Sequence, residues 1–171
     1  ALNVALTHKS YSNEFRSGFD PGMDKHNQRL EFLGDSVLGL VIAHHFYVSK
    51  RKTAEGGLTR LKAMTVCESA LKKVADKLQI GQLLRMGKGE IGTGGLPRAS
   101  NLDDAMEAVI GAIFITTDFE TAQKFVVRHF RDILDHPETV EGSKDHKSAL
   151  QELLAKRSHQ RPDYQLVAAE G

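Results

Sequence analysis

Between Gln28 and Tyr47 the chain reads QRLEFLGDSVLGLVIAHHFY. Its apolar side chains recur every three or four residues, at Leu30, Leu33, Val37, Leu38, Val41 and Ile42. This spacing lines them along one side of an α-helix, as in helices that pack against a protein core. Glu31 and Asp35 are four residues apart, so they project from one face at the border of this apolar stripe. The stretch therefore predicts a long core helix that carries two carboxylates at its edge.

The rest of the first three quarters of the chain also predicts helices. Helical periodicity recurs in four further segments: Ala1–Thr7, Leu58–Leu78, Ser100–Ile115 and Asp118–Leu134. Gly and Pro residues predict loops between them, at Tyr11–Asn27 and across the glycine-rich stretch 87–97, and Lys50–Gly57 also breaks the pattern. Because no strand is predicted before residue 137, we expect residues 1–136 to form one all-α domain.

The end of the chain has a different character. Residues 137–147 combine Pro137, Gly142 and Ser143 with charged side chains, a composition typical of a linker. Residues 148–157 then predict a short helix, and Tyr164–Val167 alternate like a strand. One helix and one strand cannot bury a core alone, so residues 148–171 predict the start of a second, incomplete domain.

A second pair of carboxylates lies on the predicted helix 100–115. Asp104 and Glu107 are three residues apart and share one face, and Ser100 with Asp103 has the spacing of a capping box. Gly111, one turn beyond Glu107, would let another segment approach closely. Asp104 could simply be a first-turn acid favoured by the helix dipole, and Glu31 and Asp35 could be surface charges. Glu107 is harder to explain in this way, because the helix around it is otherwise apolar.

Composition limits the classes of function. The 171 residues carry a net charge of +1 and a single cysteine, Cys67, which excludes an internal disulfide and fits a reducing, cytoplasmic compartment. The sequence contains no run of 18 apolar residues, so no membrane span is expected. Basic residues outnumber acidic ones between Lys50 and Lys88, whereas the charged residues between Asp103 and Glu120 are all acidic. These stretches could bind phosphate and metal, or could be two solvated helix faces of opposite charge.

Two common motifs are absent. The glycine-rich stretch 87–97 lacks the Gly-Lys-Ser/Thr ending of a nucleotide P-loop. None of the histidines pairs with Cys67 at the spacing of a zinc site. Nucleotide binding and zinc binding are therefore not expected.

Four segments together resemble the ribonuclease III family. The densest match is Asn27–Leu38, NQRLEFLGDSVL, which is similar to the family's signature segment. The others follow in the family's order: ALTHKSYSNE at 5–14, EGGLT at 55–59 and DAMEAVIGA at 104–112. The resemblance covers about residues 1–136. Residues 145–152 and 161–164 resemble the beginning of the family's double-stranded RNA-binding domain, which has the order α-β-β-β-α.

The resemblance implies a fold, an activity and a set of site residues. It implies an all-α endonuclease domain that works as a homodimer with Mg²⁺ or Mn²⁺. It also implies cleavage of both strands of double-stranded RNA, leaving 5′-phosphates and short 3′ overhangs, in the processing of ribosomal and messenger RNA. The implied metal ligands are Glu31, Asp35, Asp104 and Glu107, with Asp35 and Glu107 most directly tied to catalysis. Ser148, Gln151 and Glu152 would lie on the RNA-facing helix of the second domain.

Two positions of the signature segment raise separate questions. Phe32 points away from the apolar stripe on a helical wheel; it could pack beneath a neighbouring loop, and the resemblance implies that it enters a pocket of the partner subunit. Gln28 occupies a position where many family members have glutamate. This departure leaves the four acids intact. It puts in doubt whether position 28 supports the metal ligands from outside or positions the RNA.

Two functions remain open from the sequence. One is a dimeric, metal-dependent endoribonuclease. The other is an inactive relative that binds duplex RNA or a ribosomal particle without cutting it. The presence of all four acids favours the enzyme. The enzyme hypothesis requires Glu31 and Asp35 to lie near Asp104 and Glu107 in the fold, within reach of common cations.

Overall fold

The structure, a computed structural model, describes residues 1–15, 25–91 and 97–140, and these residues form an all-α domain. Within them no strand is present, and the only extended pairing is a single parallel bridge between Thr7 and Arg85. The elements are α1 (Leu2–Ala5), α2 (Lys9–Glu14), α3 (Gln28–Ser49), α4 (Glu55–Thr65), α5 (Glu68–Lys77), α6 (Ile80–Leu83), α7 (Ala99–Thr116), α8 (Phe119–His129), α9 (Arg131–Asp135) and the 3₁₀ turn η2 (Pro137–Thr139). The predicted linker from residue 141 and the predicted helix and strand of 148–171 lie outside the described residues.

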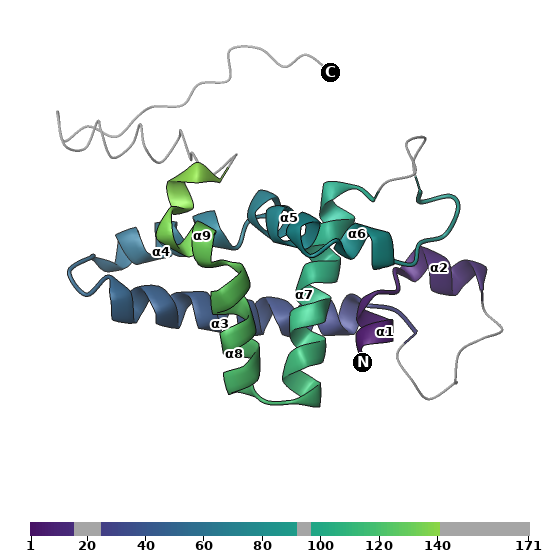
Figure 1. The fold of residues 1–171 in the computed structure, drawn as a ribbon, viewed down its shortest axis with the longest axis horizontal. Helices are drawn as coiled ribbons and strands as arrows, with labels where there is room; N and C mark the ends of the chain where they lie inside the picture. Colours follow the sequence, from purple (N-terminus) through teal and green to yellow (C-terminus); the bar gives the residue numbers. More distant parts are fainter. Residues whose placement is uncertain (16–24, 92–96, 141–171) are drawn as a thin grey trace, which may run out of the picture.

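Helix α3 runs along the length of the domain and α7 crosses it (Figure 1). Helices α5 and α8 both pack against α7, α8 also contacts α3, and α4 packs back along α3. The largest fully buried apolar side chains come from α3, α5, α7 and the segment around α8 and α9: Leu38, Val41, Ile42, Phe46, Leu71, Met106, Ile110, Val126, Phe130 and Ile133. The sequence prediction of a long core helix from Gln28 is confirmed, and so is the prediction that the helix around Glu107 belongs to the core.

Two glycines allow α3 and α7 to approach each other at the backbone. A Cβ atom added to Gly34 would overlap the carbonyl oxygen of Glu107, and one added to Gly111 would overlap the carbonyl oxygen of Leu30. Any larger residue at either position would push the helices apart. The expectation that Gly111 permits a close approach is therefore confirmed, and its partner is the helix that begins at Gln28.

The segment Leu58–Leu78 was predicted as one helix, and this prediction is wrong. Helix α4 ends at Thr65, and α5 begins at Glu68 after Cys67 adopts an extended conformation with φ −82° and ψ 157°. At the end of α4 the Thr65 hydroxyl donates to the carbonyl oxygen of Leu61 (2.9 Å), a local bond that competes with regular helix geometry. The apolar period continues across the break, so periodicity alone could not reveal it.

The segment Asp118–Leu134 is also divided. Asp118 caps α8 by accepting a hydrogen bond from the backbone N–H of Thr121 (2.7 Å), and α8 ends at His129. Phe130 then separates α8 from α9, and its ring is fully buried. Burial of this ring favours the turn at Phe130, a tertiary effect that the sequence pattern does not carry.

Two smaller predictions are corrected as well. Helix α2 occupies Lys9–Glu14, so the predicted loop 11–27 begins later than expected; residues 16–24 of it lie outside the described part. Helix α7 begins at Ala99, and the side chain that caps it is that of Asn101, whose Oδ1 accepts from the backbone N–H of Arg98 (3.1 Å). The predicted capping pair of Ser100 and Asp103 is therefore wrong, which leaves Asp103 free for another role.

Among the described residues, α3 is the one helix long and apolar enough to cross a membrane by length and composition. In this fold the apolar side chains on one side of α3 form part of the domain core, because that side packs against α7, α4 and α8. The opposite side exposes Phe32, Leu40 and Tyr47, which are 78%, 58% and 73% exposed.

Candidate metal centre at the crossing of α3 and α7

The helix crossing brings the two predicted carboxylate pairs together. Glu31 and Asp35 flank Gly34 on α3, and Gly34 lies against the backbone of Glu107 on α7. The acids are close enough to affect one another: Asp104 raises the pKa of Glu31, and Asp35 and Glu31 both raise the pKa of Glu107. The two carboxylate pairs therefore lie in one region of the fold.

Glu107 has the most strongly perturbed carboxyl group of the four. Its side chain is partly buried, and this loss of water, followed by repulsion from Asp103, Asp35, Glu31 and Asp104, raises the pKa of Glu107 to about 8. Burial disfavours the charged form of an acid, and neighbouring negative charges do the same. Without a cation nearby, Glu107 therefore holds a proton at neutral pH.

Asp103 is a fifth acid of this cluster; its spacing from Ser100 predicted a helix cap, and it is not among the metal ligands expected from the sequence. Burial, followed by repulsion from Asp104, Glu68 and Glu31, raises the pKa of Asp103 to about 6. Its Oδ1 atom is buried and accepts no hydrogen bond from the described residues. The signal was present in the sequence, because Asp103 lies one turn before Glu107 and so projects from the same face of the helix.

The outer members of the cluster are Glu31 and Asp104. Burial is the main cause that raises the pKa of each, and Asp104 adds to the effect on Glu31. Positive charge partly offsets this effect, because Lys9 lowers the pKa of both acids and His8 also lowers that of Asp104. The centre is thus an acidic cluster with a small basic flank.

The start of α7 is held in place by contacts with the N-terminal segment. His8 is buried, with Nε2 3.5 Å from Asn101 Nδ2 and Nδ1 2.8 Å from Ser10 Oγ.

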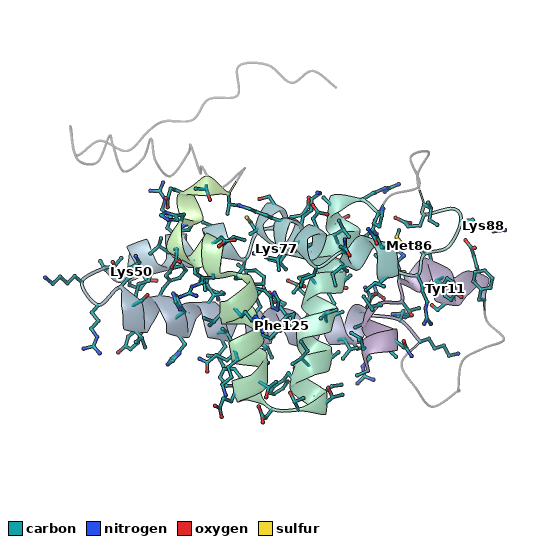
Figure 2. The ribbon with its side chains drawn as sticks, viewed as in Figure 1. Tyr11, Lys50, Lys77, Met86, Lys88 and Phe125 are labelled. Carbon is teal, nitrogen blue, oxygen red and sulfur yellow. The ribbon has the colours of Figure 1, made fainter. Side chains whose placement is uncertain are left out.

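Helix α2 also holds the loop at residues 87–89. The backbone N–H of Gly87 donates to the Ser10 hydroxyl (2.9 Å), and Glu14 accepts from the backbone N–H groups of Lys88 (3.1 Å) and Gly89 (3.4 Å). In Figure 2, Tyr11 on α2 and Lys88 in this loop accordingly lie at the same end of the domain.

The donor atoms of the cluster suit a hard divalent cation. All are carboxylate oxygens, the ligands that Mg²⁺ takes in proteins together with water and phosphate. The unpartnered Asp103 Oδ1 and the pKa of Glu107, raised to about 8, both indicate negative charge that a cation would offset. Among the described residues no three His, Cys, Asp or Glu side chains already form a closed metal site, so the carboxylates would have to rotate to bind one. The residues therefore fit such a cation in chemistry and location.

Comparison with known proteins identifies the family. A family model described as ribonuclease-III-like matches residues 1–133. Ribonuclease 3 of Clostridium perfringens is 42% identical over 170 residues, which span 99% of this chain and 69% of that protein. Ribonuclease 3 of Treponema denticola is 44% identical over 170 residues, which span 99% of this chain and 67% of that protein. The chain belongs to the ribonuclease III family.

The solved structures agree with this assignment. The nuclease domain of ribonuclease III from Campylobacter jejuni superposes with a TM-score of 0.66 at 39% identity, over 77% of this chain and 85% of that one. That structure is described as flexible in a region involved in dimer formation. The resemblance seen in the sequence is confirmed, and so is the all-α nuclease fold. The prediction that the protein is an enzyme of the RNA-cleaving hydrolase class is also confirmed.

The remaining predicted residues of this ribonuclease III domain are placed as follows. Phe32 is exposed on α3 and points away from the core, as the helical wheel predicted. Gln28 is the exposed first residue of α3. Ser148, Gln151 and Glu152, predicted to bind RNA, lie outside the described residues.

Proposed function

We propose that this ribonuclease III relative hydrolyses phosphodiester bonds in both strands of double-stranded RNA with the help of Mg²⁺, for which Mn²⁺ can substitute. The observation that carries the proposal is the gathering of Glu31, Asp35, Asp104 and Glu107 at one helix crossing in a member of a ribonuclease family. Products with 5′-phosphates and short 3′ overhangs are part of the same proposal.

Each acid has a proposed role. Glu31, Asp35, Asp104 and Glu107 would hold the cations, with Asp35 and Glu107 most directly tied to catalysis. When bound, such cations offset the charge that develops on the phosphate and make an attacking water more acidic. Glu107 must first release its proton, because its pKa is raised to about 8, so cation binding strengthens as the pH rises.

The RNA would be recognised by shape. Duplex RNA offers proteins its phosphates and 2′-hydroxyls across a shallow groove, with little access to base sequence. We propose that Ser148, Gln151 and Glu152 add contacts to such a duplex from the second domain. Precursors of ribosomal and messenger RNA in the cytoplasm are the proposed substrates.

We further propose that the protein acts as a homodimer joined along the exposed side of α3. Phe32 lies on this side, as do Leu40 and Tyr47, which line an apolar groove of about 390 Å³ against Leu58 of α4. In a dimer with two-fold symmetry the same surface serves both subunits, so each Phe32 could enter the groove of its partner. An isolated subunit would leave this large aromatic side chain in water.

The proposal is tested by incubating an end-labelled RNA duplex with the protein in Mg²⁺ and, separately, in chelator. We expect cleavage in Mg²⁺ alone, and products that a 5′-phosphate-dependent exonuclease degrades. A single-stranded RNA of the same sequence is the matched control and should stay intact. If a dimer confirmed by sedimentation binds the duplex but never cuts it, the alternative of an inactive RNA-binding relative replaces the enzyme.

A further inference from the structure

The segment Thr7–Lys9 lies between the two helices that carry the acids. The carbonyl oxygen of Thr7 accepts from the backbone N–H of Asn27 (2.9 Å), which immediately precedes α3. One residue later, His8 contacts Asn101 in the first turn of α7. Because Glu31 and Asp104 follow Asn27 and Asn101 by about one helical turn, Lys9 is brought to the flank of the acidic cluster.

The backbone of Lys9 is held firmly on both sides. The N–H of His8 donates to the carbonyl oxygen of Arg85 (2.9 Å), and the hydroxyl of Ser12 donates to the carbonyl oxygen of Lys9 itself (2.9 Å). His8 and Ser12 are buried, whereas Lys9 is exposed. The structure thus fixes the origin of the lysine side chain and leaves its charged end in solvent.

The charge of Lys9 acts on the cluster without being tied to it. Lys9 interacts with the carboxylates of both Glu31 and Asp104. Within the described residues, however, no salt bridge joins Lys9 to either acid. A lysine so placed can take another anion as partner when cations occupy the acids, since its long side chain is flexible and its ammonium group binds phosphate as a point charge.

We propose that Lys9 binds a phosphate of the RNA backbone beside the phosphate that is cut. This inference rests on the proposed function, because it assumes that RNA reaches the acidic cluster. Lys9 would then position the strand against the metal centre from the α2 side. Its contact carries no base specificity, because phosphates are common to all sequences.

The salt dependence of RNA binding provides a test that needs no turnover. Binding of a duplex is measured in Mg²⁺ at several salt concentrations, with Glu107→Gln in every protein so that the RNA stays uncut. Loss of one phosphate contact should reduce the slope of log affinity against log salt by about one. We expect this reduction for Lys9→Met and recovery of the slope for Lys9→Arg.

Lys124→Met is the matched control. Lys124 is an exposed lysine on α8, next to Gln123, which contacts His44 on α3 (3.3 Å). His44 is nine residues beyond Asp35, the nearest acid of the cluster in the same helix, about 14 Å along its axis. The control removes the same charge far from the cluster, and its slope should match that of the parent protein.

Two results would overturn the proposal. One is an unchanged slope for Lys9→Met; tighter Mg²⁺ binding by the same variant would then mean that Lys9 only offsets the charge of the acids. The other is an equal loss of slope for Lys9→Met and Lys124→Met, which would mean a general charge effect. Failure of the unsubstituted protein, with Glu107 intact, to cut RNA in Mg²⁺ would instead refute the proposed function, so the two failures are distinguishable.

Discussion

At the scale of single residues, Glu107 is the position where burial and charge conflict most. It lies on a helix whose neighbouring positions Met106, Ala108 and Ile110 are buried and apolar. An acid in such a place loses hydration, and four other acids add repulsion, so its pKa rises to about 8. A carboxylate that is unfavourable for the empty fold is well suited to a site that is completed by a cation.

Replacement of Glu107 by Gln keeps the shape of the side chain and removes the negative charge that the carboxylate would offer to a bound cation. We expect RNA cleavage in Mg²⁺ to fall by at least about 100-fold, the scale reported for loss of a group that supports transition-state charge. Binding of the RNA duplex should remain within about threefold, because the variant does not add negative charge or bulk. Single-turnover cleavage and filter binding measure the two effects, and undiminished turnover would remove Glu107 from the catalytic centre.

At the scale of secondary structure, the site depends on how closely α3 and α7 cross. Gly34 and Gly111 place backbone against backbone at this crossing, and the acids lie on the same turns. The glycines therefore connect packing to function, because the distance between the carboxylate pairs is set by the distance between the helix backbones.

Gly34→Ala should destabilise the fold and weaken the site together. The added methyl group would overlap the carbonyl oxygen of Glu107, and we expect the free energy of unfolding to fall by about 2 kcal/mol or more, since overpacking outweighs the better helix propensity of Ala. Urea denaturation measures the stability, and calorimetric titration with Mg²⁺ measures the site.

Gly56→Ala is the control for this substitution. Gly56 lies in α4, and a Cβ atom there would meet nothing within 4 Å. This variant should keep its stability or gain up to about 1 kcal/mol from helix propensity, with Mg²⁺ binding unchanged. Equal stability of the Gly34 and Gly56 variants would show that the crossing is not as tight as described.

At the scale of the whole molecule, the exposed side of α3 is expected to join two subunits. Phe32 is 78% exposed, so Phe32→Ala should leave the subunit's own stability nearly unchanged. Loss of a central aromatic contact typically weakens an interface by about 2 kcal/mol or more, which raises the dissociation constant roughly 30-fold. Sedimentation at low micromolar concentration measures the change. Leu83→Ala removes a comparably exposed apolar side chain from α6 and should leave the dimer intact; the same result for Phe32→Ala would exclude Phe32 from the interface.

The acidic cluster should also make stability depend on pH. The folded chain raises the pKa of Glu107 from its ordinary value of 4.5 to about 8, so the folded state binds a proton that the unfolded state lacks between these values. This contribution to stability is complete below the ordinary pKa and is lost as the pH rises through about 8. Burial lowers the pKa of His8, which has the opposite effect around pH 6.5, so the comparison belongs between pH 7 and 8.5.

Calorimetric melting in chelator should therefore show a lower melting temperature at pH 8.5 than at pH 7. Mg²⁺ should raise the melting temperature more at pH 8.5, where the acids are ionised and bind cations more strongly. Glu107→Gln should remove most of the pH effect because the residue that gains the proton is absent. A melting temperature that does not change between pH 7 and 8.5 in the parent protein would show that Glu107 is already ionised at pH 7.

The amino-acid sequence alone was sufficient to predict the long core helix from Gln28 and the all-α fold, and to single out the four acids as candidate metal ligands. Helical periodicity and dense motifs are local properties of the chain. The breaks at Cys67 and Phe130 could not be predicted, since the apolar period runs through both and burial in the complete fold decides where the helix turns. The burial of Asp103 with its unpartnered Oδ1, the contact of His8 with Asn101 and the position of Lys9 came only from the tertiary structure. Each depends on segments far apart in the chain, and only the crossing of α3 and α7 brings them to one place.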